Sequence, residues 1–218
     1  MAVAASHGRA GGSARRRFTQ ARRKAFARHR RDWIPAALLG LALLLFLPSA
    51  DGVAQLTLAA GFGFIVGAFV ILWQVGDVRA LPHLWGSIGE EQTAELLRQL
   101  GDGWTVDHDV PRRRGGNYDH IVAGPPGAYL VDSKNLTQPA CVVGDALVSG
   151  RVSYSGAAIR RAAAELGRAR REWVQPLVVV WGEFGQRHVE AQGVIYITAR
   201  DLVPWLTSRP VARRAVDA

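Results

Sequence analysis

The sequence predicts an α/β fold with a mixed central sheet flanked by helices, preceded by two apolar helices. Three observations predict it. Two apolar runs follow a basic N-terminal stretch. Downstream, the apolar periodicity gives the order helix, three antiparallel-type strands, helix, two strands, helix. The run P-L-V-V-V-W at 176–181 is apolar throughout, as expected of a strand buried on both faces of a sheet.

The charge is unevenly distributed over the 218 residues, whose net charge is +9. Residues 1–31 hold ten Lys and Arg and no acid, whereas residues 76–218 hold seventeen Lys and Arg against sixteen Asp and Glu. The overall basicity therefore does not by itself indicate a nucleic-acid partner. Residues 1–31 are rich in Gly, Ala, Ser and Arg, which predicts a basic, disordered or loosely helical cytoplasmic tail.

Residues 32–75 form the predicted transmembrane hairpin, with helices at about 33–49 and 53–75. The second run is long enough to cross a bilayer core of about 30 Å. Small residues, among them Gly63 and Gly67, would allow close helix packing. The ten positive charges before the first helix predict a multi-pass protein of the cell membrane with both termini in the cytoplasm and the lipid bilayer as a partner. The alternative is a pair of buried helices in a soluble core.

The remaining elements are assigned from capping, alternation and turn signals. Ser87 and Glu90 match a capping box, which predicts a helix over 88–100. The single cysteine, Cys141, excludes an intramolecular disulfide and a thiolate zinc site, and we expect it to be buried. The other expected elements are strands at 104–110, 141–143, 146–152, 176–181 and 194–197, a helix from Ser155 to 173, and a helix over 198–205.

The stretch 117–135, N-Y-D-H-I-V-A-G-P-P-G-A-Y-L-V-D-S-K-N, reads as two strands joined by a Gly-Pro-Pro-Gly turn. Residues whose numbers sum to 251 would pair across it, which places Asp119 opposite Asp132 at about 5 Å between Cβ atoms. Lys134 shares a face with Asp132 because strand side chains alternate. Two like charges at this distance repel, so we expect a positive group between them, either Lys134 or a divalent cation.

The spacing of Asp119 and Asp132-x-Lys134 resembles the D-(X)n-(D/E)-x-K signature of the restriction-endonuclease-like fold. The surrounding blocks are Gly86-x-x-Gly89-Glu90 at a helix start, Y-D-H-I-V at 118–122, and G-A-Y-L-V-D-S-K-N at 127–135. Together they resemble the nuclease-related domain (NERD) family, closely over 84–135 and more loosely to about 207. The resemblance implies a nuclease-like domain over 84–207 with a restriction-endonuclease-like mixed central sheet.

The resemblance also implies an active site made of Glu90, Asp119, Asp132 and Lys134. Carboxylate oxygens are the ligands that Mg²⁺ prefers, and the metal would neutralise the phosphate and lower the pKa of an attacking water. Asp119 and Asp132 would hold Mg²⁺ or Mn²⁺, Glu90 would complete the shell directly or through water, and Lys134 would stabilise developing charge.

Other residues of the stretch have competing readings. Glu90 serves as a helix cap, as a site residue, or as both. The loop before the hairpin holds three basic residues, Arg112, Arg113 and Arg114. They are either contacts for substrate phosphates or solvated surface residues without a role in the site. His120 points away from Asp119, which favours core packing over catalysis, and Ser133 also faces away from the expected metal.

The sequence as a whole predicts a membrane-anchored, Mg²⁺-dependent nuclease-like protein that hydrolyses phosphodiester bonds of DNA or RNA in the cytoplasm. The alternative is a catalytically inactive nuclease fold that serves as a membrane-tethered binding or assembly module. The sequence does not decide whether the domain is an active enzyme, and it predicts no oligomeric state.

Overall fold

A computed structural model describes residues 10–46, 52–75, 81–113 and 115–211. The chain divides into two compact units, one of Met1–Arg15 with Trp85–Ala218 and one of Arg16–Leu84. The helices are α1 (Gly12–Phe46), α2 (Gly52–Val75), α3 (Leu81–Leu97), α4 (Gly156–Arg170), the 3-10 helix η3 (Ala199–Asp201) and α5 (Leu202–Ser208). The strands are β1 (Thr105–Pro111), β2 (Asn117–Gly124), β3 (Gly127–Asn135), β4 (Ala140–Val143), β5 (Ala146–Ser149), β6 (Val152–Ser155), β7 (Val174–Trp181), β8 (His188–Ala191) and β9 (Val194–Thr198).

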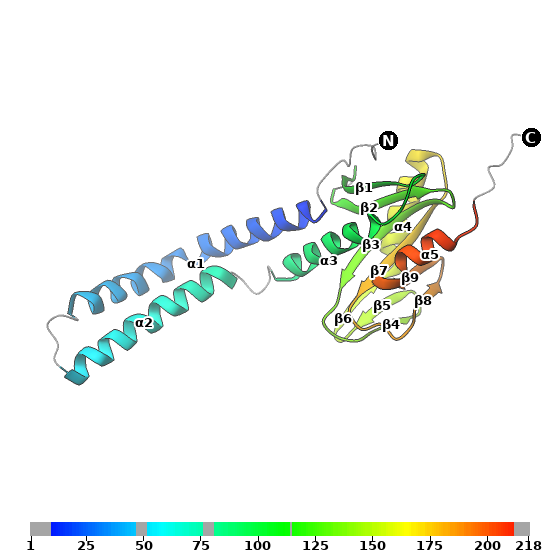
Figure 1. The fold of residues 1–218 in the computed structure, drawn as a ribbon. Helices are drawn as coiled ribbons and strands as arrows, with labels where there is room; N and C mark the ends of the chain where they lie inside the picture. Colours follow the sequence, from blue (N-terminus) through cyan, green and yellow to red (C-terminus); the bar gives the residue numbers. More distant parts are fainter. Residues whose placement is uncertain (1–9, 47–51, 76–80, 114, 212–218) are drawn as a thin grey trace, which may run out of the picture. The chain divides into compact units, whose positions relative to one another are not determined.

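A six-stranded mixed sheet in the order β1-β2-β3-β7-β9-β8 forms the centre of the larger unit. The strands β1, β2 and β3 are antiparallel neighbours, β3, β7 and β9 are parallel, and β8 is antiparallel to β9. Figure 1 shows α4 on one face of this sheet and α3 and α5 on the other. The predicted α/β class with a mixed sheet flanked by helices is confirmed.

Each face of the sheet has its own apolar core. The α4 face buries Ile159 and Leu166 of the helix against strand residues such as Leu130 and Val178. The opposite face buries Leu97 of α3 and both Leu202 and Leu206 of α5 against the valines of the strands. β7 contributes to both cores, with five consecutive buried residues from Pro176 to Val180, which confirms the reading of its apolar run.

Several predicted boundaries differ from the structure. Residues 146–155 form β5 and β6, which pair with β4 in a separate three-stranded antiparallel sheet instead of extending the central one. The predicted helix start at Ser87 is wrong, because α3 begins at Leu81 and Ser87 is buried within it. Ser155 does cap α4, since its hydroxyl accepts the Ala157 N–H at 3.2 Å. Cys141 is exposed, which overturns the expectation that it is buried.

The smaller unit contains most of α1 and all of α2. Residues 12–31, which the composition predicts to be a disordered tail, form the first part of α1, while residues 1–9 lie outside the described part of the chain. The two helices approach at Gly40, where an added Cβ would lie 3.7 Å from the side chain of Ile65. No atom lies within 4 Å of a Cβ added at Gly63 or Gly67, so these two glycines of the expected set do not make a close helix contact.

The prediction of a two-pass membrane protein is contradicted. None of the helices in the described ranges combines the length and the apolar character needed to cross a bilayer. In α1 the apolar segment from Trp33 to Phe46 would span about 21 Å, short of the bilayer core of about 30 Å. The predicted location in the membrane is therefore wrong, and the transmembrane hairpin on which it was based is not supported.

Candidate active site

The β2–β3 hairpin has the predicted register. His120 pairs with Val131 and Gly124 with Gly127, so the paired residue numbers sum to 251. Asp119 and Asp132 follow directly outside the last of these pairs. One oxygen of Asp119, Oδ2, accepts the main-chain N–H of Ser133 at 3.0 Å. The two carboxylates are therefore held on adjacent strands at the end of the hairpin.

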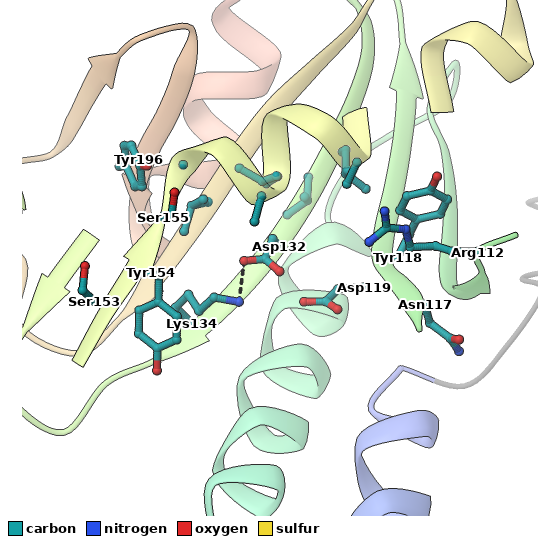
Figure 2. Close-up of a pocket in the computed structure, with 17 residues that line it drawn as sticks. Arg112, Asn117, Tyr118, Asp119, Asp132, Lys134, Ser153, Tyr154, Ser155 and Tyr196 are labelled. Atoms are coloured by element: carbon teal, nitrogen blue, oxygen red, sulfur yellow. Dashed lines mark ion pairs between the residues drawn. The ribbon is translucent and has the colours of Figure 1, made fainter. Parts of the chain in front are cut away.

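Lys134 forms the closest contact to this pair of acids. Its Nζ lies 2.5 Å from Oδ2 of Asp132, and the two side chains are 23% and 30% exposed. The ammonium also lies 5.3 Å from the centre of the Tyr154 ring. Burial lowers the pKa of Lys134, but the charges of Asp132 and Asp119 raise it further, so the net shift is upward and the side chain stays protonated. Figure 2 shows this ion pair with Asp119 beside it.

The pKa of Asp119 is raised well above its usual value by burial and by the neighbouring charges of Asp132 and Glu90. Lys134 and the N–H of Ser133 act in the opposite direction and do not cancel the effect. The carboxylates of this site repel one another, and the one lysine that contacts them offsets only part of that repulsion.

Glu90, on α3, interacts electrostatically with Asp132 and Lys134 of the same site. Burial and the charges of Asp109 and Asp132 raise its pKa to about 7, while a main-chain hydrogen bond from Gly11 and the charge of Lys134 lower it. Glu90 lies in the middle of α3, so it does not cap the start of that helix. Its side chain is not among those lining the cleft described below, but it interacts with the acids that do.

Asp109 is a further carboxylate of this region that the sequence reading missed. It is 6% exposed, and its φ of +52° is rare for a residue other than glycine. Oδ1 of Asp109 accepts a hydrogen bond from Nδ2 of Asn117 at 2.8 Å. Strained backbone of this kind gathers at functional sites. The sequence does contain a signal for it. Asp109 is the second acid of D-H-D at 107–109, and side chains two residues apart on a strand lie on the same face.

A cleft of about 360 Å³ lies beside these acids, between the β2–β3 strands and the start of α4. Its polar lining includes Asp119, Asp132 and Lys134, and Ser155 and Gly156 bring the N-terminus of α4 to the same space, as Figure 2 shows. A Cβ added at Gly156 would lie 2.3 Å from the carbonyl oxygen of Asp145, so glycine is needed for this approach of the helix.

The arginines of the 112–114 loop are not equivalent. Arg112 lines the cleft, where its Nη2 lies 2.9 Å from Oε2 of Glu165 and its guanidinium lies 5.2 Å from the centre of the Tyr118 ring. The Nε of Arg112 is buried, and no group in the described part of the chain accepts a hydrogen bond from it. Arg113 is exposed and does not line the cleft. Arg114 lies outside the described residues.

The opposite face of the same strands carries a buried chain of neutral hydrogen bonds. Ser133 donates its hydroxyl proton to Thr93 at 2.8 Å, and Thr93 donates its own to the carbonyl of Gly89 at 2.8 Å. The chain continues from Ser133 to His120 Nε2 at 3.3 Å and from His120 Nδ1 to His108 Nδ1 at 2.7 Å. Burial lowers the pKa of His120 to about 3, so the ring is neutral.

These hydrogen bonds link α3 to β3. A further bond links α3 to β7, because the indole N–H of Trp181 donates to the hydroxyl of Thr93 at 2.8 Å. They fix the helix that carries Glu90 relative to the strand that carries Asp132. His120 and Ser133 are thus buried and do not line the cleft, as the alternation of strand side chains predicts.

Asp119 and Asp132 are the two acids of the cleft that could hold a divalent cation. Among the described residues, no three His, Cys, Asp or Glu side chains are arranged as a ready metal site. Mg²⁺ is usually held by one or two carboxylates with water and substrate phosphate supplying the other ligands, so two acids could hold it. A cation there would offset the part of the raised pKa of Asp119 that comes from Asp132 and Glu90, which adds to the larger effect of burial.

Comparison with known proteins gives a match to a family model over part of the chain. Residues 85–181 match the family model of the nuclease-related domain. The matched segment contains all four residues of the predicted site and runs from α3 to the end of β7. Searches among curated proteins and among solved structures gave no match. Residues 85–181 are thus similar to a nuclease-related domain, and such a domain is consistent with nucleic acid as a partner.

Proposed function

We propose that the domain hydrolyses phosphodiester bonds of DNA or RNA with the help of Mg²⁺ or Mn²⁺. The observation that carries the proposal is the group of Asp119, Asp132 and Lys134 at one cleft, with Glu90 in electrostatic contact, inside the segment that matches the nuclease-related family. Buried acids with raised pKa values beside a lysine are typical of catalytic sites, because a fold gains no stability from placing them together.

Asp119 and Asp132 would hold the metal, which would supply charge neutralisation of the phosphate and a more acidic water. Lys134 stays protonated and would donate hydrogen bonds to the phosphate oxygens as negative charge develops on them. Arg112 lines the same cleft and would contact a substrate phosphate. Glu90, with its pKa near 7, is suited to accept a proton from water at neutral pH.

Cleavage assays with the full chain test this proposal. Plasmid and single-stranded oligonucleotide substrates are incubated with Mg²⁺, with Mn²⁺ and with EDTA. We expect cleavage that needs the metal and that falls at least 100-fold in Lys134→Ala and Glu90→Gln, in line with the loss of one charge-stabilising group. Glu95→Gln is the matched control, because Glu95 lies on the exposed face of the same helix.

The second candidate is a nuclease fold without activity that serves as a binding or assembly module. The specific observation in its favour is the ion pair of Lys134 with Asp132, which occupies one of the acids in the absence of a metal. This candidate predicts no cleavage with either metal and no binding of Mg²⁺ or Mn²⁺ by calorimetry. Cleavage that is unchanged in Lys134→Ala would overturn the proposed mechanism.

A further inference from the structure

A groove with a volume of about 700 Å³ is lined by α4 residues other than those that line the cleft. Residues of α4 line both spaces: Ala158 and Ala162 belong to the cleft, and Ala163 and Gly167 belong to the groove. The floor and far wall of the groove come from β7 and from the β8–β9 turn at Gln192 and Gly193. A polymer lying in the cleft could therefore continue over one helix into the groove.

An exposed tryptophan stands at one end of this groove. Trp173 is 77% exposed, which is unusual for the largest apolar side chain. The connection that presents it is fixed, since the N–H of Glu172 donates to the carbonyl of Gly167 at 3.1 Å. An added Cβ at Gly167 would lie 2.7 Å from the carbonyl oxygen of Glu172, so this close approach requires glycine.

Two arginines without acidic partners flank Trp173. Arg168 and Arg171 line the groove and are exposed, and neither side chain makes an ion pair within the described part of the chain. Arg161 lies two turns before Arg168 on the same exposed face of α4 and is likewise exposed. The acid that lines the groove, Glu172, lies 3.8 Å from Arg170. The free charge at the groove is therefore positive.

The walls of the groove are held by hydrogen bonds. Arg160 is paired with Asp145 at 2.8 Å and donates to the carbonyl of Gln192 at 3.4 Å. Gln175 donates to the carbonyl of Gly193 at 2.9 Å. The groove is thus a preformed concave surface, and its volume falls within the range of about 300–1,000 Å³ that is usual for ligand sites.

We propose that this groove binds single-stranded nucleic acid, with a base stacked on Trp173 and the flanking phosphates held by Arg168 and Arg171. Aromatic platforms next to unpaired cations are how proteins hold single strands without sequence preference. A duplex keeps its bases stacked on one another and cannot offer one to the indole. A concave surface with a single exposed tryptophan also fits a strand better than a flat lipid surface.

The inference extends the proposed function, because the ligand of the groove is the polymer that the cleft would cut. The proposed binding in the groove does not require cleavage. Only the connection between the groove and the cleft rests on the proposed function. Binding is measured in excess EDTA, where hydrolysis does not occur, so a failure of binding and a failure of cleavage are separate results.

Fluorescence anisotropy of a labelled oligothymidylate with the full chain tests the groove. Trp173→Ala should weaken binding by roughly 5- to 150-fold, the loss expected for one stacked base. Trp173→Phe should restore most of the affinity, because a phenyl ring still stacks. The doubly substituted chain Arg168→Gln with Arg171→Gln should lower the slope of log affinity against log salt by about 1.4, since each phosphate contact on a single strand contributes about 0.7.

Arg200→Gln is the control for the arginines, because Arg200 is 80% exposed and lies in η3, away from the groove. Equal affinity of Trp173→Ala and the natural chain would overturn the proposal. So would equal weakening of single-stranded and duplex binding by Trp173→Ala. Binding to vesicles of anionic lipid that depends on Trp173, without such dependence for the oligonucleotide, would assign the surface to a membrane and overturn it as well.

Discussion

The two faces of the β2–β3 hairpin both place polar side chains inside the protein, and they do so in opposite ways. On one face Asp119, Asp132 and Lys134 carry charges that are only partly compensated, and burial together with the charges of Asp132 and Glu90 raises the pKa of Asp119. On the other face His120 and Ser133 join a chain of neutral groups in which each donor finds an acceptor. The first arrangement costs stability and would supply the chemistry of the proposed function, whereas the second contributes stability.

The difference teaches how adjacent residues divide two tasks. Strand side chains alternate, so Asp132 and Ser133 are neighbours in sequence and lie on opposite faces. If the comparison is right, substitutions on the cleft face change activity far more than stability, and substitutions on the opposite face do the reverse.

The largest expected effect is the loss of activity in Asp119→Asn. An asparagine keeps an oxygen that accepts the N–H of Ser133, but it removes one of the two charges that would hold the metal. Cleavage should fall at least 100-fold. The melting temperature without metal should stay the same or rise, because repulsion with Asp132 and Glu90 is relieved. A large fall in melting temperature would mean that Asp119 is structural.

A smaller effect, this time on stability, is expected for Thr93→Val. The valine keeps the shape but leaves the buried hydroxyl of Ser133 and the indole N–H of Trp181 without their acceptor. We expect a loss of about 2–3 kcal/mol in the free energy of unfolding, measured by denaturant titration. Cleavage by the folded fraction should change only a few-fold. Thr57→Val is the control, because its hydroxyl bonds only within its own exposed helix.

The third effect concerns pH, and after screening by solvent we expect it to be the smallest of the three. The pKa of Glu90 is about 7 in the folded protein against about 4.5 unfolded, so the folded state binds the proton more tightly. Glu90 therefore lowers stability as pH rises from about 4.5 to 7, by up to about 3 kcal/mol before screening by solvent. Melting curves in EDTA should show this slope, and Glu90→Gln should flatten it. An unchanged slope in Glu90→Gln would contradict the assignment.

Two extensions sharpen this prediction. Mg²⁺ should stabilise the protein more above pH 7 than below, because it competes with protons for the carboxylates. Asp109→Asn should move the Glu90 transition to lower pH, since it removes a neighbouring negative charge and keeps the oxygen that accepts from Asn117.

The central part of the site could be predicted from sequence because it depends on local geometry. A two-residue turn fixes the register of a hairpin, and alternation then fixes which face each side chain occupies. Asp119, Asp132 and Lys134 were found in this way. Their roles in catalysis remain proposals.

The parts that sequence missed depend on contacts between distant segments. Asp109 is drawn into the site by an unusual backbone angle, which no alternation pattern shows. The strands β4, β5 and β6 form a sheet of their own. Which sheet a short strand joins depends on tertiary contacts, and the local sequence of these strands does not show it. The basic and aromatic groove is assembled from α4, β7 and the β8–β9 turn, so no single stretch displays it.

The apolar N-terminal runs show a different failure. Apolar composition predicted two membrane crossings, but the first run is the end of one long helix whose earlier turns are highly charged. The basic residues and the apolar run belong to one continuous helix. The composition of the apolar stretch alone therefore did not show where that helix begins.

The most direct test of the division between the two faces compares Asp132→Asn with Ser133→Ala in the full chain. Cleavage rate with Mg²⁺ and free energy of unfolding are measured for both. We predict that Asp132→Asn abolishes cleavage with little change in stability, and that Ser133→Ala lowers stability by about 1–3 kcal/mol and keeps cleavage within a few-fold. Loss of cleavage in both variants, or in neither, would contradict the account.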